Sequence, residues 1–137
     1  MNILIVCSGN TCRSPMAEVY LKSVFPCWRV GSAGTRALDG APATALAQTV
    51  AREFGLDLSR HRARSLCSVA GEEFDRVWVM GREHLLEAPP QAKLLSSLQG
   101  ESRSVRDPYG GTLADYLAAF EEIRRYLDAL GSGEDDS

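Results

Sequence analysis

Residues 2–15 read NILIVCSGNTCRSP and carry the signals of a strand, a loop and a helix in direct succession. Within residues 2–6, the run 3–6 is apolar and rich in β-branched side chains, which predicts a buried parallel strand over residues 2–6. Ser14 is a good N-cap residue and Pro15 suits the first helical position, so a helix is predicted to start near Ser14. The loop of residues 7–13 then lies beyond the carboxyl end of a strand, where open parallel sheets bind ligands.

The rest of the chain alternates strand-like runs with helical patterns, which predicts an α/β fold with a parallel sheet and right-handed crossovers. Further strands are predicted at 28–31, 76–80 and 93–96, and further helices at 44–54, 83–87 and 113–130. We expect one domain over residues 1–131 and a disordered acidic tail over residues 132–137. Four residues outside the loop are expected to be packing residues: Cys27, Trp28, Cys67 and Trp78.

The composition excludes several classes of protein. The chain has 137 residues, enough for one core without disulfides or metals. A net charge of −3 provides no basic field, so a nucleic-acid partner is not expected. No apolar run is long enough for a membrane span and no secretory signal follows Met1, so we expect a cytoplasmic protein without a membrane partner. We also expect a monomer.

The four cysteines do not indicate a metal site or a disulfide framework. Cys7 and Cys12 are five residues apart, and neither His61 nor His84 completes a usual zinc spacing with them. A reducing compartment and a domain of this size do not need disulfide bonds. We therefore expect no metal and no cofactor.

The loop of residues 7–13 has the features of a phosphate-binding loop. Gly9 and Asn10 tolerate unusual backbone conformations, so the loop can curl and point its N–H groups inward as an anion site beside a helix N-terminus. Cys7, at the bottom of this loop, would be a thiolate nucleophile. Arg13 has a planar guanidinium that can hold two oxygens of a phosphoryl group. Ser14 could donate its hydroxyl to the thiolate and assist its departure.

Two of these residues have simpler interpretations. Cys7 could be a small buried hydrophobic residue at a strand end. Asp107 could be a turn former, because Asp-Pro commonly opens a turn. Its alternative role is that of a general acid, since a leaving group needs a proton from an acid opposite the nucleophile.

The segment CSGNTCRSPMAE, residues 7–18, closely resembles the signature of the low-molecular-weight protein tyrosine phosphatases. Four later segments resemble the family in the same order: GSAGT at 31–35, HRARSL at 61–66, FDRVWVM at 74–80 and DPYGG at 107–111. The resemblance implies a single-domain four-stranded parallel sheet flanked by helices on both faces. It also implies a metal-free protein phosphatase that hydrolyses phosphotyrosine in phosphorylated proteins through a phosphocysteine intermediate.

The resemblance also assigns roles to individual residues. It implies that Cys7 is the nucleophile, Arg13 the phosphate-binding arginine and Asp107 the general acid. Tyr109 would form an aromatic wall of the substrate cleft. The remaining residues of the substrate site would be Ser8, Gly9, Asn10, Thr11, Cys12 and Ser14.

Four further positions have supporting roles in this resemblance. Asn10 would hold the loop open through hydrogen bonds, with Ser32 supporting it from the second strand. Cys12 matches a loop cysteine that forms a reversible disulfide with Cys7 under oxidation. His61 lies in a family-like segment, where we expect it to form structural hydrogen bonds.

The sequence leaves three alternatives to phosphotyrosine hydrolysis. Some bacterial relatives hydrolyse phosphoarginine, and they carry Thr at the position of Thr11, where a small polar side chain leaves room for a guanidinium. An arsenate reductase on this fold would need further redox cysteines, and Cys67 has no neighbouring cysteine. A phosphocysteine relay of a sugar phosphotransferase system would not need Arg13 or Asp107. Both are present.

Overall fold

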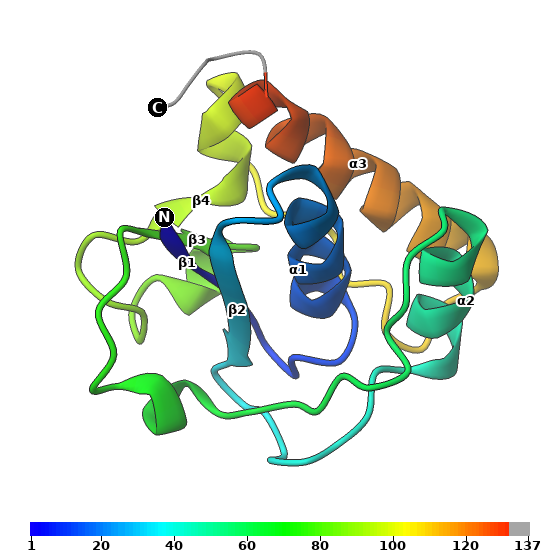
Figure 1. Ribbon diagram of the computed structural model, residues 1–137, viewed down its shortest axis with the longest axis horizontal. Coiled ribbons are helices and arrows are strands. Elements are labelled where there is room, and N and C mark those ends of the chain that lie inside the picture. The colour runs from blue at the N-terminus through cyan, green and yellow to red at the C-terminus, as the bar shows by residue number, and fades with distance from the viewer. Residues whose placement is uncertain (132–137) are drawn as a thin grey trace.

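The computed structural model describes residues 1–131 and contains one four-stranded parallel sheet (Figure 1). The strands are β1 (Asn2–Cys7), β2 (Arg29–Gly34), β3 (Arg76–Val79) and β4 (Lys93–Leu94), in the spatial order β2-β1-β3-β4. The chain crosses from β2, on one side of β1, to β3, on the other. Such a switch in direction is where open α/β sheets bind ligands, just beyond the carboxyl ends of the strands.

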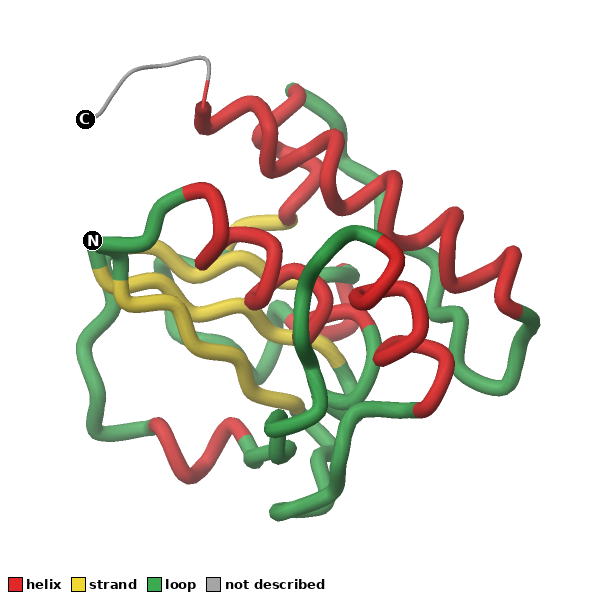
Figure 2. Tube along the Cα trace, turned by 45° about the vertical axis from the view of Figure 1, so that its right-hand side comes forward, coloured by secondary structure: helices red, strands yellow, loops and turns green. Residues whose placement is uncertain are grey.

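Three α-helices lie on one side of the sheet: α1 (Arg13–Val24), α2 (Ala45–Glu53) and α3 (Leu113–Gly131). Helices α1 and α3 pack together over the strands, and α2 lies against both (Figure 2). The opposite face is covered by a short 3-10 helix, Leu66–Val69, and by the side chains of Phe74, Ala88 and Ala92. The predicted fold class is therefore confirmed, although the second face carries a short 3-10 helix in place of long α-helices.

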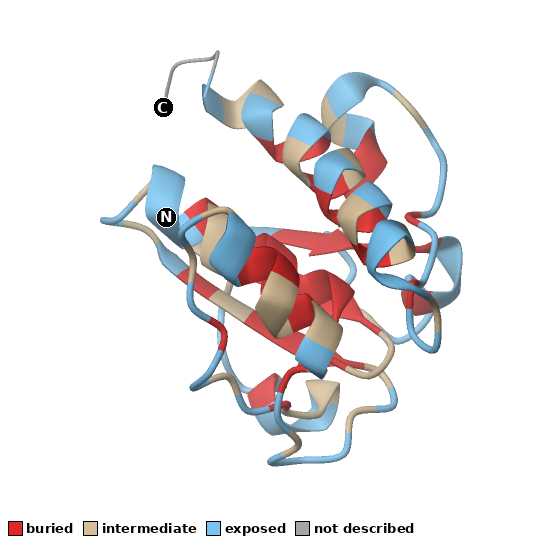
Figure 3. Cartoon of the chain, turned by 90° about the vertical axis from the view of Figure 1, so that its right-hand side faces the viewer, coloured by how far each residue is buried: buried red, intermediate tan, exposed pale blue. Residues whose placement is uncertain are grey.

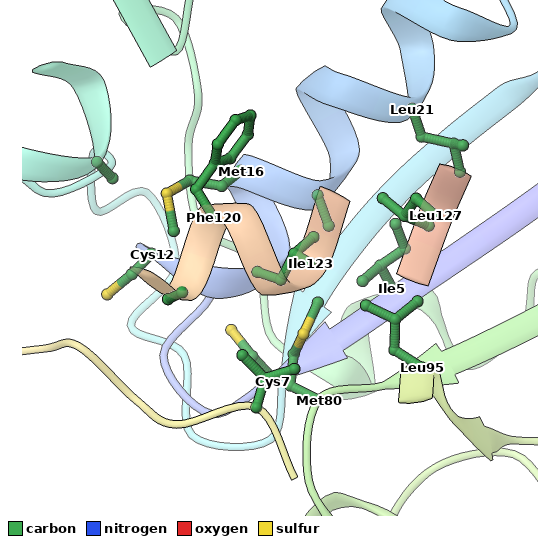
Figure 4. Packing of buried hydrophobic residues seen from close by; sticks show 14 of the residues in the cluster. Ile5, Cys7, Cys12, Met16, Leu21, Met80, Leu95, Phe120, Ile123 and Leu127 are labelled. Atoms are coloured by element: carbon green, nitrogen blue, oxygen red, sulfur yellow. The ribbon is translucent and has the colours of Figure 1, made fainter. Parts of the chain in front are cut away.

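The residues of β1 alternate between two hydrophobic clusters. Ile3 and Ile5 belong to the cluster under the α-helices, whereas Leu4 and Val6 belong to the cluster on the other face. A strand buried on both faces is apolar throughout, which explains why residues 3–6 form a continuous hydrophobic run. Figure 4 shows the larger cluster, in which Cys7 lies with side chains from α1 and α3.

Helix α3 is amphipathic, with a buried inner face and an exposed outer face (Figure 3). Its buried side chains include Tyr116, Phe120, Ile123 and Leu127. Tyr126 is also fully buried. It is accommodated there because its single hydroxyl hydrogen is shared between carboxylate oxygens of Glu122, at 2.7 Å, and Glu101, at 3.1 Å.

The start of α1 differs from the prediction. The helix begins at Arg13 with Cys12 at the N-cap position, so Ser14 is not the cap. The Ser14 hydroxyl instead contacts Cys7 and Asn10 inside the preceding loop. At the other end of the helix, Val24 is exposed.

Other boundaries also shift. The second strand is longer than predicted, and the fourth ends at Leu94 because a 3-10 helix, Leu95–Gln99, follows. The predicted helix at 83–87 is a 3-10 helix, Arg82–His84. By contrast, the helix predicted at 44–54 is α2, with Thr44 as its N-cap and Phe54 as its C-cap. No helix within residues 1–131 is long and apolar enough to cross a membrane.

The predicted packing residues divide into two groups. Trp78 is buried in β3 as expected. Trp28 lies just before β2, half-buried, and stacks on Phe25 with ring centroids 3.9 Å apart. Cys27 and Cys67 are exposed, so the prediction that they pack in the interior is wrong. The predicted tail, residues 132–137, lies outside the described residues.

Candidate active site

The phosphate-binding loop (residues 7–13) joins the end of β1 to the start of α1. Cys7 is the last residue of β1 and Arg13 is the first residue of α1. Asn10, midway between them, has a φ of +56°, a left-handed conformation that asparagine adopts more readily than most residues. The loop curls at Asn10, and Cys7 and Arg13, at its two ends, line the same cleft.

A buried hydrogen-bond network fixes the surroundings of the Cys7 sulfur. The backbone N–H of Arg64 donates to Oδ1 of Asn10 at 2.9 Å, which identifies the opposite side of the Asn10 amide as Nδ2. Nδ2 donates to the hydroxyl oxygens of Ser14 and Ser32, both at 2.8 Å. Since Ser14 Oγ accepts from Asn10, its own hydrogen is free to point at Cys7 Sγ, 2.9 Å away.

The far end of the network is a carboxylate. The Ser32 hydroxyl donates to Oε1 of Glu18 at 2.5 Å, and Glu18 Oε2 pairs with Lys22 at 2.8 Å. Because Glu18 accepts from Ser32, Ser32 must in turn accept from Asn10. The carboxylate of Glu18 thus determines which group donates in each hydrogen bond of the network. The last of these hydrogen bonds is donated by Ser14 to the Cys7 sulfur.

The main chain of the loop is held by neighbouring segments. The backbone N–H of Arg36 donates to the Ser8 carbonyl at 2.9 Å, and that of Thr44 donates to the Thr11 carbonyl at 3.0 Å. The Asn10 carbonyl accepts from Nε2 of His61 at 2.7 Å. The expected structural role of His61 and the expected support of Asn10 by Ser32 are both present in this network.

The inner side of the loop presents unpaired donors. Asn10 N–H points at Cys7 Sγ, 3.3 Å away. Among the hydrogen bonds of residues 1–131, none uses the backbone N–H of Gly9, Thr11 or Cys12 as a donor. Free N–H groups in a curled loop beside a helix N-terminus form a site for an anion.

Arg13 extends from the start of α1 to the opposite wall of the site. Its side chain is buried, and Nη1 donates to the Val105 carbonyl at 2.8 Å. Nη2 lies 3.5 Å from Oδ2 of Asp107, whose side chain is 48% exposed. The structure thus brings together the two ends of the loop and the distant DPYGG segment, as predicted.

These groups line a cleft of about 470 Å³. Of the predicted site residues, Cys7, Ser8, Gly9, Thr11, Cys12, Arg13, Asp107 and Tyr109 line this cleft. Asn10 and Ser14 are fully buried beneath the loop and act on it from below. Tyr109 stands at the rim with 70% of its surface exposed, and Leu38 and Pro42 form an apolar part of the wall.

Cys12 differs from Cys7 in its surroundings. Its Sγ lies 3.7 Å from the hydroxyl oxygen of Tyr116, and burial raises the pKa of the Cys12 thiol. Burial also raises the pKa of Tyr116, to about 12. Both Cys7 and Cys12 are free thiols in this structure.

Sequence reasoning missed several residues of the site. His84 is completely buried and its Nε2 lies 2.9 Å from the Ser8 hydroxyl. The sequence did offer one signal for His84: it follows the end of β3 closely, and β3 ends at the same sheet edge as β1, where the site lies. Arg36 and Leu38 also line the cleft, and no local motif marked them. Within residues 1–131, no group of three or more His, Cys, Asp or Glu side chains is arranged to hold a metal ion.

A curled loop with a cysteine at its base, an arginine at its end and an aspartate opposite defines a class of small α/β enzymes that act on phosphoryl groups. The family model described as "Low molecular weight phosphotyrosine protein phosphatase" matches residues 2–133. The chain belongs to this family and is a protein phosphatase.

Individual relatives cover most of the chain. The low molecular weight protein-tyrosine-phosphatase Wzb of Salmonella typhi is 35% identical over 129 residues, 90% of this chain and 87% of Wzb. The protein-arginine-phosphatase of Geobacillus stearothermophilus is 35% identical over 137 residues, 93% of this chain and 92% of the relative.

A solved structure of the YwlE arginine phosphatase also matches this fold. It is a mutant with a phosphorylated active site serine, 30% identical to this chain. It superposes with a TM-score of 0.87 and covers 94% of this chain and 92% of that one.

Proposed function

We propose that this phosphatase hydrolyses phosphotyrosine in proteins, with Cys7 as the nucleophile. In the first step the Cys7 thiolate attacks phosphorus: the S–P bond forms, the P–O bond to the phenol breaks, and Asp107 protonates the departing oxygen. In the second step water attacks the phosphocysteine, giving up its proton to the Asp107 carboxylate. The S–P bond breaks, inorganic phosphate leaves and the Cys7 thiolate is restored.

The observation that carries this proposal is the directed hydrogen bond from Ser14 to Cys7. A hydroxyl hydrogen at 2.9 Å and the Asn10 N–H at 3.3 Å both stabilise negative charge on sulfur. The same charge develops when the thiolate leaves in the second step, so these groups assist both steps. A cysteine that served only as a packing residue would not need this network.

Arg13 and Asp107 supply the other half of the chemistry. The Arg13 guanidinium is held by the Val105 carbonyl, so its remaining N–H groups keep a fixed direction for phosphoryl oxygens. A bound phosphoryl group competes with Asp107 for Arg13. Its binding would free the Asp107 carboxyl group to face the leaving group.

The walls of the cleft favour an aryl phosphate. Tyr109, Leu38 and Pro42 offer apolar surface at the rim, where the ring of a phosphotyrosine would lie. The relative Wzb, named as a protein-tyrosine-phosphatase, supports the same substrate class.

A second candidate substrate is phosphoarginine, and Thr11 is the observation that favours it. Thr11 lines the cleft next to the phosphoryl position, where its small polar side chain leaves room for a guanidinium. The Geobacillus stearothermophilus relative named as a protein-arginine-phosphatase is as similar as Wzb. The phosphorylated active site serine in the YwlE mutant further supports transfer of the phosphoryl group to the residue at the nucleophile position.

The deciding experiment compares kcat/KM for two peptides that differ only in carrying phosphotyrosine or phosphoarginine. We expect kcat/KM to be higher for the phosphotyrosine peptide than for the phosphoarginine peptide. We expect Cys7→Ala to turn over neither peptide. A higher kcat/KM for the phosphoarginine peptide would establish the second candidate. Turnover of either peptide by Cys7→Ala would contradict the proposed mechanism.

A further inference from the structure

His84 lies directly behind the phosphate-binding loop and is not part of it. It ends the 3-10 helix Arg82–His84, which follows β3, and its side chain is completely buried. One ring nitrogen, Nε2, lies 2.9 Å from the hydroxyl oxygen of Ser8. The other, Nδ1, lies 3.0 Å from the backbone nitrogen of Gly81. Both nitrogens of a buried imidazole are therefore engaged.

The Gly81 contact determines the tautomer of His84. A backbone N–H can only donate, so Nδ1 must accept and carries no hydrogen. A neutral imidazole then has its hydrogen on Nε2, which donates to Ser8 Oγ. Since Ser8 Oγ accepts from His84, its own hydrogen is free to donate elsewhere.

Ser8 follows Cys7 directly and lines the cleft. A phosphoryl group bound at Cys7 would offer an acceptor oxygen to a hydroxyl that faces this cleft. We infer that His84 is a positioning residue, which turns the Ser8 hydroxyl hydrogen toward an oxygen of the phosphoryl group. This inference rests on the proposed function, because it assigns Ser8 to the same phosphoryl site.

The surroundings of His84 favour the neutral ring, which this arrangement requires. Burial lowers the pKa of His84, and the charge of Arg13 lowers it further, whereas three carboxylates oppose these effects: Glu83, Asp107 and Glu87. The nearest of these, Glu83, has an oxygen 3.7 Å from Nε2 but is largely exposed. A protonated ring would place a second N–H against the Gly81 N–H, so protonation would break that contact.

The test is a double-mutant cycle with Ser8→Ala and His84→Leu, measured as kcat/KM on a phosphopeptide and as the Kd for inorganic phosphate. Loss of one hydrogen bond to a charged oxygen predicts that each single variant loses about tenfold to a hundredfold in kcat/KM. The double variant should lose no more than the worse single variant, because both changes remove the same hydrogen bond. His84→Gln, which restores a donor near the Nε2 position, should recover most of the loss. Ser68→Ala, a remote surface serine, is the control and should match the wild type.

Two outcomes would overturn the inference: losses that multiply in the double variant, or an Nδ1–H tautomer in the ¹⁵N NMR spectrum of the wild-type ring. The spectrum decides the question even if His84→Leu does not fold. A wild type that binds phosphate but hydrolyses no phosphopeptide would contradict the proposed function instead. In that case the phosphate Kd of Ser8→Ala still tests the role of Ser8, with weaker binding expected and unchanged binding contradicting it.

Discussion

Arg13 Nη2 lies 3.5 Å from Asp107 Oδ2, so the fold itself places the candidate phosphate clamp beside the candidate general acid. The contact joins the first turn of α1 to the segment that precedes α3. Because the Asp107 side chain is half-exposed, this ion pair contributes little to stability and can exchange readily for a bound phosphoryl group.

Replacing Asp107 by Asn should slow catalysis in a way that depends on the leaving group. The variant keeps the size of the side chain and loses the proton donor. We expect kcat/KM for a phosphopeptide to fall by about 10²–10⁴-fold, and to fall much less for an aryl phosphate whose phenol leaves without a proton. Steady-state kinetics on both substrates checks this. Equal losses on the two substrates would show that Asp107 is not the acid.

Replacing Thr11 by Ile should move selectivity from phosphoarginine toward phosphotyrosine. The larger apolar side chain would narrow the cleft and remove a hydroxyl, which an aromatic ring tolerates better than a guanidinium. We expect the ratio of the two kcat/KM values to change by roughly ten- to two-hundred-fold. Thr11→Ser, which keeps the hydroxyl, is the matched control. An unchanged ratio in Thr11→Ile would remove the residue-level argument for phosphoarginine.

Gly34 allows β2 to approach the phosphate-binding loop closely. A Cβ at this position would lie 2.3 Å from the Ser8 carbonyl oxygen and 3.0 Å from the Asn10 backbone nitrogen. Gly34→Ala should therefore lower the free energy of unfolding by about 1–3 kcal/mol and reduce activity as the loop shifts. Gly71→Ala meets no atom within 4 Å and should leave both unchanged. Urea unfolding of the two variants makes the comparison, and equal stability would contradict the packing argument.

His84 should make the stability of the fold depend on pH in the acidic range. Burial lowers the pKa of His84 in the folded state. At a pH near the ordinary histidine pKa of about 6.5, His84 therefore binds more protons in the unfolded chain than in the folded one. The free energy of unfolding should thus decrease as the pH falls below that value. His84→Gln should show a smaller decrease between pH 7 and pH 5 in urea unfolding. Identical pH dependence in the variant and the wild type would exclude this contribution.

The sequence predicted the parts of the site that are local in the chain. Cys7, Asn10 and Arg13 lie within one strand–loop–helix unit, where spacing and residue type indicate the chemistry. Asp107 and Ser32 lie far away, and the family resemblance was needed to bring them to the loop. His84 could not be assigned, because its role depends on which ring nitrogen faces Gly81 and Ser8. That orientation follows from the tertiary fold.

The wrong predictions about the fold also arise from tertiary contacts that are not local in the sequence. Ser14 has the residue type of an N-cap, but a tertiary contact with the Cys7 sulfur takes its hydroxyl. Cys67 resembles a small buried residue, yet it lies on the exposed side of a 3-10 helix that local pattern did not reveal. Propensity describes what a residue does in isolation, and packing decides which partner it takes.

The central claim is that the phosphoryl group passes through the sulfur of Cys7. The most direct test mixes the enzyme with a phosphotyrosine peptide, quenches within the first turnover, and locates the phosphoryl group by mass spectrometry. The mechanism predicts that the peptide containing Cys7 gains the mass of one phosphoryl group, that Asp107→Asn still forms this adduct, and that Cys7→Ala does not. Product release by the wild type with no phosphorylated Cys7 at any quench time, or a phosphoryl group found on another residue, would contradict it.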